Sequence, residues 1–297
     1  MTPGAAILAE WDAKSVPGAI DAAARDVADR FSPGVAGVLF YGSCLRTGQV
    51  ADRILDFYVL VDRYRPVYDR AWLAVANRVL PPNVFYHETR WGDQVLRSKV
   101  AVLSLDDLAR RVSPDCLNVS VWARFSQPVL LLQARSRADR RHIADQVGRA
   151  VTTMLAHARP MAPDADHAGL WKTAFRQTYR AELRSEKGGK GDEIHALDAA
   201  RYEKLTPLML PHLPPQAARG PTAARWYWWL RRVNGKTVSF LRLIKAAATF
   251  DGGIDYLAWK IERHSGVPVP VTDAMRRHPI RSGLRLFWQL RRKGAFR

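Results

Sequence analysis

The 297-residue sequence is poor in cysteine, in long apolar runs and in acidic side chains. Its two cysteines, Cys44 and Cys116, are too few for a disulfide framework or a cysteine-rich zinc site, which favours a reducing compartment. No run of about 18 apolar residues occurs, so we expect no membrane-spanning helix. The first residues, MTPGAAILAEWDAKS, lack the basic and apolar regions of a secretion signal and the arginines of a transit peptide. These absences predict a soluble or peripheral protein on the cytoplasmic side.

The deficit of acidic residues is concentrated in the second half of the chain. Lys and Arg number 46 against 28 Asp and Glu, which gives a formal net charge of +18. Residues 167–297 hold 25 of the basic and 10 of the acidic side chains. An excess of this size favours a polyanionic partner: a nucleic acid, an anionic membrane or a phosphorylated substrate. Apolar residues make up 47% of the chain, a globular balance that excludes a mostly disordered protein.

Strand and helix patterns alternate in the first part of the chain, and helical patterns dominate after residue 137. Short apolar runs bounded by turn residues predict buried strands, and apolar residues spaced by three and four predict helices. The expected strands cover 35–41, 54–61, 84–88 and 94–104. The expected helices cover 18–31, 66–79, 105–112, 137–158, 167–186, 194–209, 222–232, 236–249, 254–264 and 280–292. Residues 118–132 give a mixed pattern, part strand and part turn.

This order of elements predicts an α+β fold with three parts. Residues 1–104 would form a catalytic domain built on a mixed sheet with helices. Residues 105–165 would form a small mixed linking domain, for which a winged helix is one alternative. Residues 166–297 would form a basic helical domain that ends in a membrane-facing helix.

The stretch YGSCLRTGQVADRILDFYVLV carries the strongest chemical signal. An apolar strand runs into Gly42-Ser43, and after twelve intervening residues Asp56 interrupts the next apolar strand. Glycine lets the backbone approach a triphosphate closely, and the serine hydroxyl can hold phosphate oxygens. A carboxylate on the adjacent strand can hold Mg²⁺, which bridges substrate phosphates. The alternative is a loop in which Asp56 caps a neighbouring backbone, but a carboxylate buried without a partner is costly.

This layout resembles the signature of the nucleotidyltransferase superfamily, in which Gly-Ser follows a hydrophobic strand and two acids alternate with an apolar residue on the next strand. Tyr58 stands where that signature has its second acid. A second Mg²⁺ ligand therefore has to come from elsewhere or be absent. The resemblance suggests Glu88, at the end of the third expected strand, with a solvated strand end as the alternative. Asp62 is interpreted as a turn residue.

Five segments in order carry a narrower resemblance. They are Tyr41-Gly42-Ser43, Asp56-Phe57-Tyr58-Val59, Ser98-Lys99-Val100-Ala101-Val102, Ala123-Arg124-Phe125-Ser126-Gln127-Pro128 and Thr178-Tyr179-Arg180-Ala181-Glu182-Leu183-Arg184. Together they resemble the mitochondrial translocator-assembly-and-maintenance type of phosphatidate cytidylyltransferase, a CDP-diacylglycerol synthase, and its bacterial relatives. The resemblance spans residues 35–210. An Asn-x-x-His-Tyr-Ser element of that family appears only as Asn83-Val84-Phe85-Tyr86, and the Lys99 segment lacks the family's aromatic residue and glycine. The nucleotide or the lipid can therefore differ.

The resemblance implies roles for residues of the first four segments. Tyr41, Gly42 and Ser43 would bind the triphosphate, and Asp56 would hold Mg²⁺. Lys99 and Arg124 would neutralise phosphate charge, since an ammonium and a guanidinium fork both suit phosphate oxygens. Without the resemblance, Lys99 is equally well explained as an edge lysine that reaches solvent, and Arg124 as a structural arginine.

The fifth segment lies on an expected helix. The resemblance implies that Tyr179, Glu182 and Arg184 contact the substrate. The alternative is a solvated helix face, because Arg180 and Arg184 lie one turn apart with acidic residues between and after them.

Residues 276–297 form a basic amphipathic stretch with eight Arg and Lys and no acid. Its apolar residues fall on one helical stripe, namely Ile280, Leu284, Phe287 and Trp288, and Arg281, Arg285, Arg291 and Arg292 flank it. Such a helix can lie in the headgroup plane of an anionic bilayer. The alternative is that the aromatic rings pack on the protein core. A second aromatic and basic cluster occupies residues 225–236.

We therefore expect a Mg²⁺-dependent enzyme that transfers a cytidylyl group from CTP to phosphatidic acid. The protein would be peripheral on the inner face of the cell membrane. Two alternatives remain open: nucleotidyl transfer to a soluble or RNA acceptor, and a non-catalytic basic adaptor on a degenerate nucleotidyltransferase scaffold. Nucleic-acid binding suits the charge, but the sequence has no compact recognition motif of the usual types.

Overall fold

The computed structural model describes residues 1–50, 53–182, 190–249 and 271–272. Its centre is a five-stranded mixed sheet in the order β3-β4-β2-β1-β5. The strands are β1 (Val35–Tyr41), β2 (Ile54–Val61), β3 (Asn83–Trp91), β4 (Gln94–Ser104) and β5 (Val129–Ala134). Only β2 and β4 pair in parallel among the neighbouring strands of this sheet. The predicted α+β class, with a mixed sheet and helices, is confirmed.

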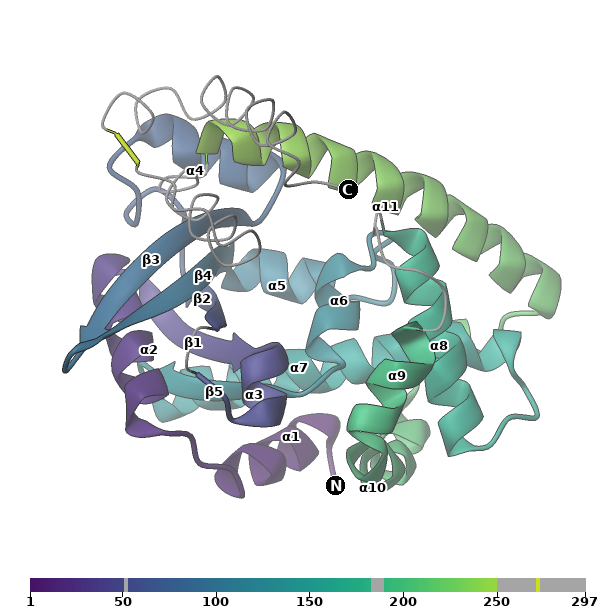
Figure 1. Cartoon of the computed structure of the whole chain (residues 1–297). Coiled ribbons are helices and arrows are strands. Elements are labelled where there is room, and N and C mark those ends of the chain that lie inside the picture. Colours follow the sequence, from purple (N-terminus) through teal and green to yellow (C-terminus); the bar gives the residue numbers. More distant parts are fainter. Residues whose placement is uncertain (51–52, 183–189, 250–270, 273–297) are drawn as a thin grey trace, which may run out of the picture.

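Helices surround the sheet and extend the molecule away from it (Figure 1). They are α1 (Pro3–Asp12), α2 (Gly18–Arg30), α3 (Ser43–Thr47), α4 (Ala71–Val79), α5 (Leu105–Arg111), α6 (Ser120–Phe125), α7 (Arg137–Ala158), α8 (His167–Ala181), α9 (Lys190–Leu197), α10 (Ala199–Met209) and α11 (Pro221–Thr249). Helices α8, α9 and α10 gather on one side, and the long helix α11 runs from them across the molecule to α4 (Figure 1). Within the described residues, none of the helices combines the length and hydropathy needed to cross a bilayer.

The sheet separates two hydrophobic clusters, because successive side chains of a strand point to opposite faces. On β2, Phe57 and Val59 pack in the cluster that contains α2 residues, whereas Tyr58 and Leu60 pack in the cluster that contains α7 residues. Asp56 lies two residues before Tyr58. The backbone alternation therefore places the Asp56 side chain on the α7 face of the sheet.

Strand β5 comes from the predicted linking domain but belongs to the central sheet. It pairs antiparallel with β1, where Leu131 lies opposite Leu39 and Val129 opposite Tyr41. The mixed pattern of residues 118–132 thus resolves into α6 followed by an edge strand. The domain boundaries at 104 and 165 stay a prediction.

Helix α11 corrects the prediction of two helices over 222–232 and 236–249. The chain is helical without interruption through Asn234 and Gly235, which are local helix breakers. A Cβ on Gly235 would overlap the carbonyl oxygen of Ala181 at the end of α8. Glycine is thus present at this position because the two backbones approach closely, and tertiary packing overrides its low helix propensity.

Other bounds differ at the ends of the elements. Helix α8 ends at Ala181 where the pattern predicted 186, and residues 194–209 divide into parts of α9 and α10 at Asp198. Helix α1, which the sequence patterns did not predict, begins after Thr2, whose hydroxyl accepts the Ala5 N–H. The helices predicted at 254–264 and 280–292 lie outside the described residues.

Candidate functional site

Three predicted site residues meet in one row across the sheet. In the strand register, Tyr41 on β1 lies opposite Asp56 on β2, and Asp56 lies opposite Lys99 on β4. Tyr86 on β3 continues the row beyond Lys99. Residues opposite one another on adjacent strands project to the same face. Asp56 is therefore flanked by the Tyr41 phenol on one side and by the exposed Lys99 ammonium on the other.

Gly42 turns the chain directly after β1 and before Ser43, the first residue of α3. Its φ of 90° lies in the region that favours glycine. A Cβ at this position would lie 2.5 Å from Oδ2 of Asp56. The structure thus brings the aspartate and the glycine-serine bend into direct contact, which is the arrangement that the sequence motif predicts.

The Asp56 carboxyl is largely enclosed and is surrounded by positive charge. Burial raises its pKa above the usual value, while Lys99, Arg124 and Arg46 lower it in that order. The three cations offset part of this effect of burial, so they favour the carboxylate form without cancelling the rise of the pKa. The sequence analysis did not identify Arg46, which lies on α3 three residues after Ser43. Its closeness to the Gly-Ser pair in sequence was the signal that could have found it.

Arg124, on α6, joins the site through Tyr41. Its Cζ lies 5.1 Å from the centroid of the Tyr41 ring, within the range of a cation–π contact. Burial lowers its pKa, but Tyr41, Tyr58, Glu182 and Asp56 together raise it above the usual value. Arg124 is therefore firmly charged, and the carboxylates of Asp56 and Glu182 both stabilise that charge.

Tyr58 occupies the place of the second superfamily acid and is a core residue. Its ring is buried, with centroids 5.2 Å from Tyr41 and 5.0 Å from Phe125. Burial raises the pKa of its phenol, so the side chain stays neutral. Tyr58 supports Tyr41 and the α6 segment from beneath and supplies no negative charge next to Asp56.

Glu88 is not brought to Asp56. It lies on β3, and β4 separates that strand from β2, so the two backbones are about 10 Å apart. Its carboxylate accepts a hydrogen bond of 2.6 Å from the Tyr86 hydroxyl and lies 3.6 Å from Nε of Arg97. The role of Glu88 as a metal ligand stays a prediction. Among the residues that the structure describes, no three His, Cys, Asp or Glu side chains are grouped as a metal site would require.

The fifth sequence segment reaches the site at the end of α8. Tyr179 is half-buried against the core, and Glu182 follows the last helical residue, where its N–H donates to the Tyr179 carbonyl at 3.3 Å. The charge of Glu182 raises the pKa of both Arg124 and Tyr58. Arg184 lies outside the described residues. So do the predicted membrane residues Arg281, Arg285, Phe287, Trp288, Arg291 and Arg292.

Positive charge continues from the site to α11 through Arg242, which the sequence analysis did not identify. Its guanidinium donates to the Pro81 carbonyl, at 2.6 Å from Nη2, and to the Ser120 hydroxyl at 2.8 Å. Burial lowers its pKa, and Tyr58 and Glu182 partly oppose that effect. No sequence pattern predicts this position, because 120 or more residues separate Arg242 from its partners.

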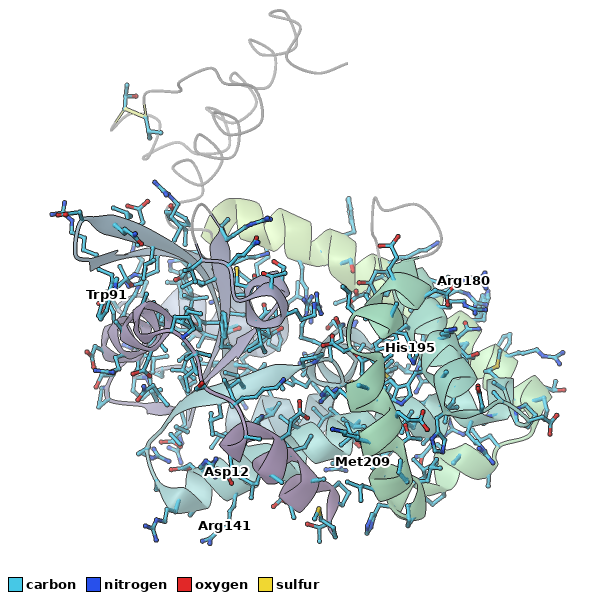
Figure 2. All side chains as sticks on the ribbon, turned by 60° about the horizontal axis from the view of Figure 1, so that its bottom comes forward. Asp12, Trp91, Arg141, Arg180, His195 and Met209 are labelled. Atoms are coloured by element: carbon cyan, nitrogen blue, oxygen red, sulfur yellow. The ribbon has the colours of Figure 1, made fainter. Side chains whose placement is uncertain are left out.

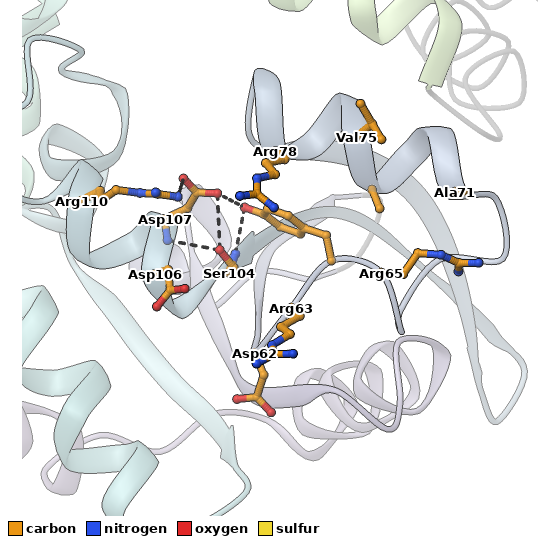
Figure 3. Close-up of a pocket in the computed structure, with 12 residues that line it drawn as sticks. Asp62, Arg63, Arg65, Ala71, Val75, Arg78, Ser104, Asp106, Asp107 and Arg110 are labelled. Atoms are coloured by element: carbon orange, nitrogen blue, oxygen red, sulfur yellow. Dashed lines mark hydrogen bonds and ion pairs between the residues drawn. The ribbon is translucent and has the colours of Figure 1, made fainter.

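Two cavities lie away from Asp56: the first is near Asp62 and Ser104, at the other end of the parallel strands, and the second is near Arg111 and Cys116. Their volumes are about 450 and 550 Å³, and none of the predicted site residues lines them. In the first, the Asp107 carboxylate accepts from the Tyr64 hydroxyl at 2.5 Å and from Ser104 at 3.3 Å (Figure 3). Asp62 pairs with Arg135 at 2.5 Å. These acidic groups are engaged in structural contacts, so we place the candidate site at Asp56 instead.

Comparisons with known proteins leave the family open. No protein-family profile matches the chain, and no curated protein does. Among solved structures, a nucleotidyltransferase-like protein from Exiguobacterium sibiricum is similar over 93% of this chain and 92% of its own length. The sequence identity is 12% and the TM-score is 0.28. A TM-score this low carries no argument, so the functional assignment depends on the site itself.

Proposed function

We propose that this protein is a Mg²⁺-dependent nucleotidyltransferase whose catalytic carboxylate is Asp56. One observation carries the proposal: the enclosed Asp56 carboxylate lies against the Gly42 bend and is flanked by Lys99, Arg124 and Arg46. Three cations around a single carboxylate leave an excess of positive charge at the bend. Phosphate groups complement that excess, and glycine permits their close approach to the backbone.

The donor set fits a magnesium ion that arrives with its nucleotide. Mg²⁺ is commonly held by one or two carboxylates together with substrate phosphates, rather than by a cage of protein ligands. Asp56 supplies one carboxylate, and its charged neighbours Lys99, Arg124 and Arg46 are all cations. The phosphates would therefore supply the other ligands. When held by Asp56, the ion would offset the negative charge that develops on the phosphates during transfer.

The residues of the site would act by positioning and by charge. The Ser43 hydroxyl and the backbone at Gly42 would hold the triphosphate, and Lys99, Arg124 and Arg46 would neutralise its oxygens. Tyr41 keeps Arg124 in place through the ring contact. If the acceptor is a phosphate, it is already ionised, so no general base is needed. In-line attack on the α-phosphate would then release pyrophosphate.

The five-segment resemblance supports CTP as the nucleotide and phosphatidic acid, or a similar lipid phosphate, as the acceptor. The product would be CDP-diacylglycerol, formed at an anionic membrane surface on the inner face of the cell membrane. Tyr179, Glu182 and Arg184 would contact substrate at the end of α8. Residues 276–297 would add a basic contact with the membrane.

The experiment is a screen of nucleotides against acceptors with purified protein and Mg²⁺. Each nucleoside triphosphate is combined with lipid vesicles containing phosphatidic acid, with soluble phosphates and with RNA, and the products are identified by mass. CDP-diacylglycerol formation supports the proposal, and transfer to RNA or a soluble phosphate would replace its acceptor. Nucleotide binding without any product would favour the non-catalytic adaptor.

A further inference from the structure

Helix α11 exposes an unusual set of side chains to solvent. Its 29 residues include six Arg and Lys and no acid. Large apolar side chains are nevertheless exposed along it, among them Trp226 at 59%, Trp229 at 45% and Phe240 at 58%. Val233 and Leu241 are exposed as well. Soluble proteins seldom leave an apolar patch of this extent uncovered unless it binds something.

These residues form one continuous stripe. Trp226, Trp229, Val233 and Phe240 follow one another at intervals of three, four and seven, so they lie on one side of the helix. Three basic residues, Arg225, Arg232 and Lys236, border the same side of this stripe at intervals of seven and four. We call the four apolar residues with Leu241 the α11 stripe. Its length from residue 226 to 241 is about 22 Å.

The opposite side of α11 fixes the helix on the protein. Trp228 is buried, and its indole N–H donates to the His157 carbonyl at 3.0 Å. Gly235 touches the end of α8, and Arg242 binds the loop before β3. The α11 stripe is therefore the outward face of a helix that is already anchored, and it is not needed to hold the helix in place.

Two aromatic residues of the stripe contact each other without any partner. The Trp226 and Trp229 rings stack with centroids 4.8 Å apart and an angle of 19° between their planes. Beside them, Arg219 lies 3.9 Å from the centroid of the Tyr227 ring. Little side-chain freedom would be lost when these rings contact a surface.

We propose that the α11 stripe is a docking surface for an anionic lipid bilayer. Tryptophan prefers the boundary between headgroups and acyl chains, and the adjoining Phe and Val residues can enter that boundary with it. The bordering arginines and lysine complement lipid phosphates, and α11 offers no acid that would repel them. The proposal rests on the proposed function for the identity of the acceptor lipid.

The first test measures binding of the full chain to vesicles of phosphatidylcholine with phosphatidylglycerol, and to phosphatidylcholine alone. The triple variant Trp226→Ser, Trp229→Ser, Phe240→Ser should bind the anionic vesicles about tenfold more weakly or worse. The matched control is Trp91→Ser. Trp91 is 46% exposed at the tip of the β3–β4 ribbon, on the other side of the molecule from Arg180 of α8 (Figure 2). Equal binding of wild type and the triple variant overturns the proposal.

A second test locates the contact regardless of other membrane-binding segments. An environment-sensitive dye is attached at Thr237→Cys, on the α11 stripe, or at Gln94→Cys on β4, both exposed positions, in a Cys116→Ser background. Anionic vesicles should shift the emission to the blue at residue 237 and leave it unchanged at residue 94. A shift that appears with RNA instead, or on self-association without vesicles, overturns the lipid assignment.

Failure of this proposal can be told apart from failure of the proposed function. The triple variant should retain pyrophosphate release with a short-chain, water-soluble phosphatidic acid while losing vesicle binding. Absence of pyrophosphate release from the wild-type protein, with vesicle binding intact, would remove the enzymatic function and leave the docking surface standing.

Discussion

The Asp56 carboxylate lies against the α-carbon of Gly42, so closely that a Cβ there would be 2.5 Å from Oδ2. The register of the sheet enforces this contact, because Tyr41, which precedes Gly42, is directly opposite Asp56. The site is thus formed by backbone geometry at the end of β1 as much as by side-chain chemistry. A substitution of Gly42 should therefore disturb the site as directly as a substitution of Asp56.

Gly42→Ala should lower transfer activity by about a hundredfold, because its methyl group displaces the Asp56 carboxylate. The backbone at φ 90° and ψ −163° lies in a region that essentially only glycine adopts, which adds about 1–3 kcal/mol of strain. Gly48→Ala is the matched control, since Gly48 has φ 68° and no heavy atom within 4 Å of the added Cβ. It should lose less stability in denaturant than Gly42→Ala, because nothing opposes its Cβ, and should keep its activity. Equal activity of the two variants would refute the role of the contact.

Lys99→Met should move the acidic limb of the activity profile to higher pH. Lys99 is the leading charge that lowers the Asp56 pKa against burial, so its removal raises that pKa further. Asp56 must be ionised to act, and activity would therefore be lost at a higher pH than in the wild type. Lys99→Arg retains the charge and should restore the limb. The measurement is kcat/KM against pH, and a limb at the same pH in Lys99→Met contradicts the electrostatic coupling.

Gly235→Ala should destabilise the protein by about 1–3 kcal/mol, although alanine favours helices. The added methyl group meets the Ala181 carbonyl, which is backbone and cannot move aside as a side chain would. Gly220→Ala, where a Cβ meets nothing within 4 Å, should change the free energy of unfolding by less than about 0.5 kcal/mol. Chemical denaturation measures both. If Gly235→Ala leaves the free energy of unfolding unchanged or raises it, the close backbone contact between α11 and α8 is contradicted.

Stability should fall as the pH drops from 6.5 toward 3, in part because of His157. Burial and Arg231 lower the pKa of His157 to about 3, so the unfolded chain binds a proton in this window that the folded chain does not. This loss of unfolding free energy fades above pH 6.5 and reaches a few kcal/mol near pH 3. His157→Gln, which stays neutral and can still bond the Pro114 carbonyl, should flatten the dependence of unfolding free energy on pH. Identical slopes for both proteins would contradict this assignment.

Local patterns predicted those elements whose boundaries coincide with changes in apolar character. Strands 35–41, 54–61 and 94–104 and helix 137–158 have the predicted bounds. The division of α11 was wrong because Asn234-Gly235 is a breaker in isolation, while its packing partner Ala181 lies more than 50 residues away. Helix α1 carries a recognisable start, with Thr2 as cap and proline at the first position, but has no strong apolar periodicity.

The site was predictable to the extent that it lies within one motif. Gly42 and Asp56 are close in sequence and adjacent in the sheet, so strand pairing alone brings them together. Arg124 required the family resemblance, because no periodicity links it to Asp56. Arg242 was beyond sequence reasoning, since only the folding of α11 over the sheet places its charge near Tyr58 and Glu182.

The most direct test of the central claim is pyrophosphate release from CTP with Mg²⁺ and phosphatidic acid vesicles, compared between wild type and Asp56→Asn. Both proteins should unfold at similar denaturant concentrations, because asparagine preserves the shape of the side chain. We predict steady release by the wild type and a loss of at least about a hundredfold in the variant. Release by Asp56→Asn at the wild-type rate would contradict the assignment of Asp56 as the catalytic carboxylate.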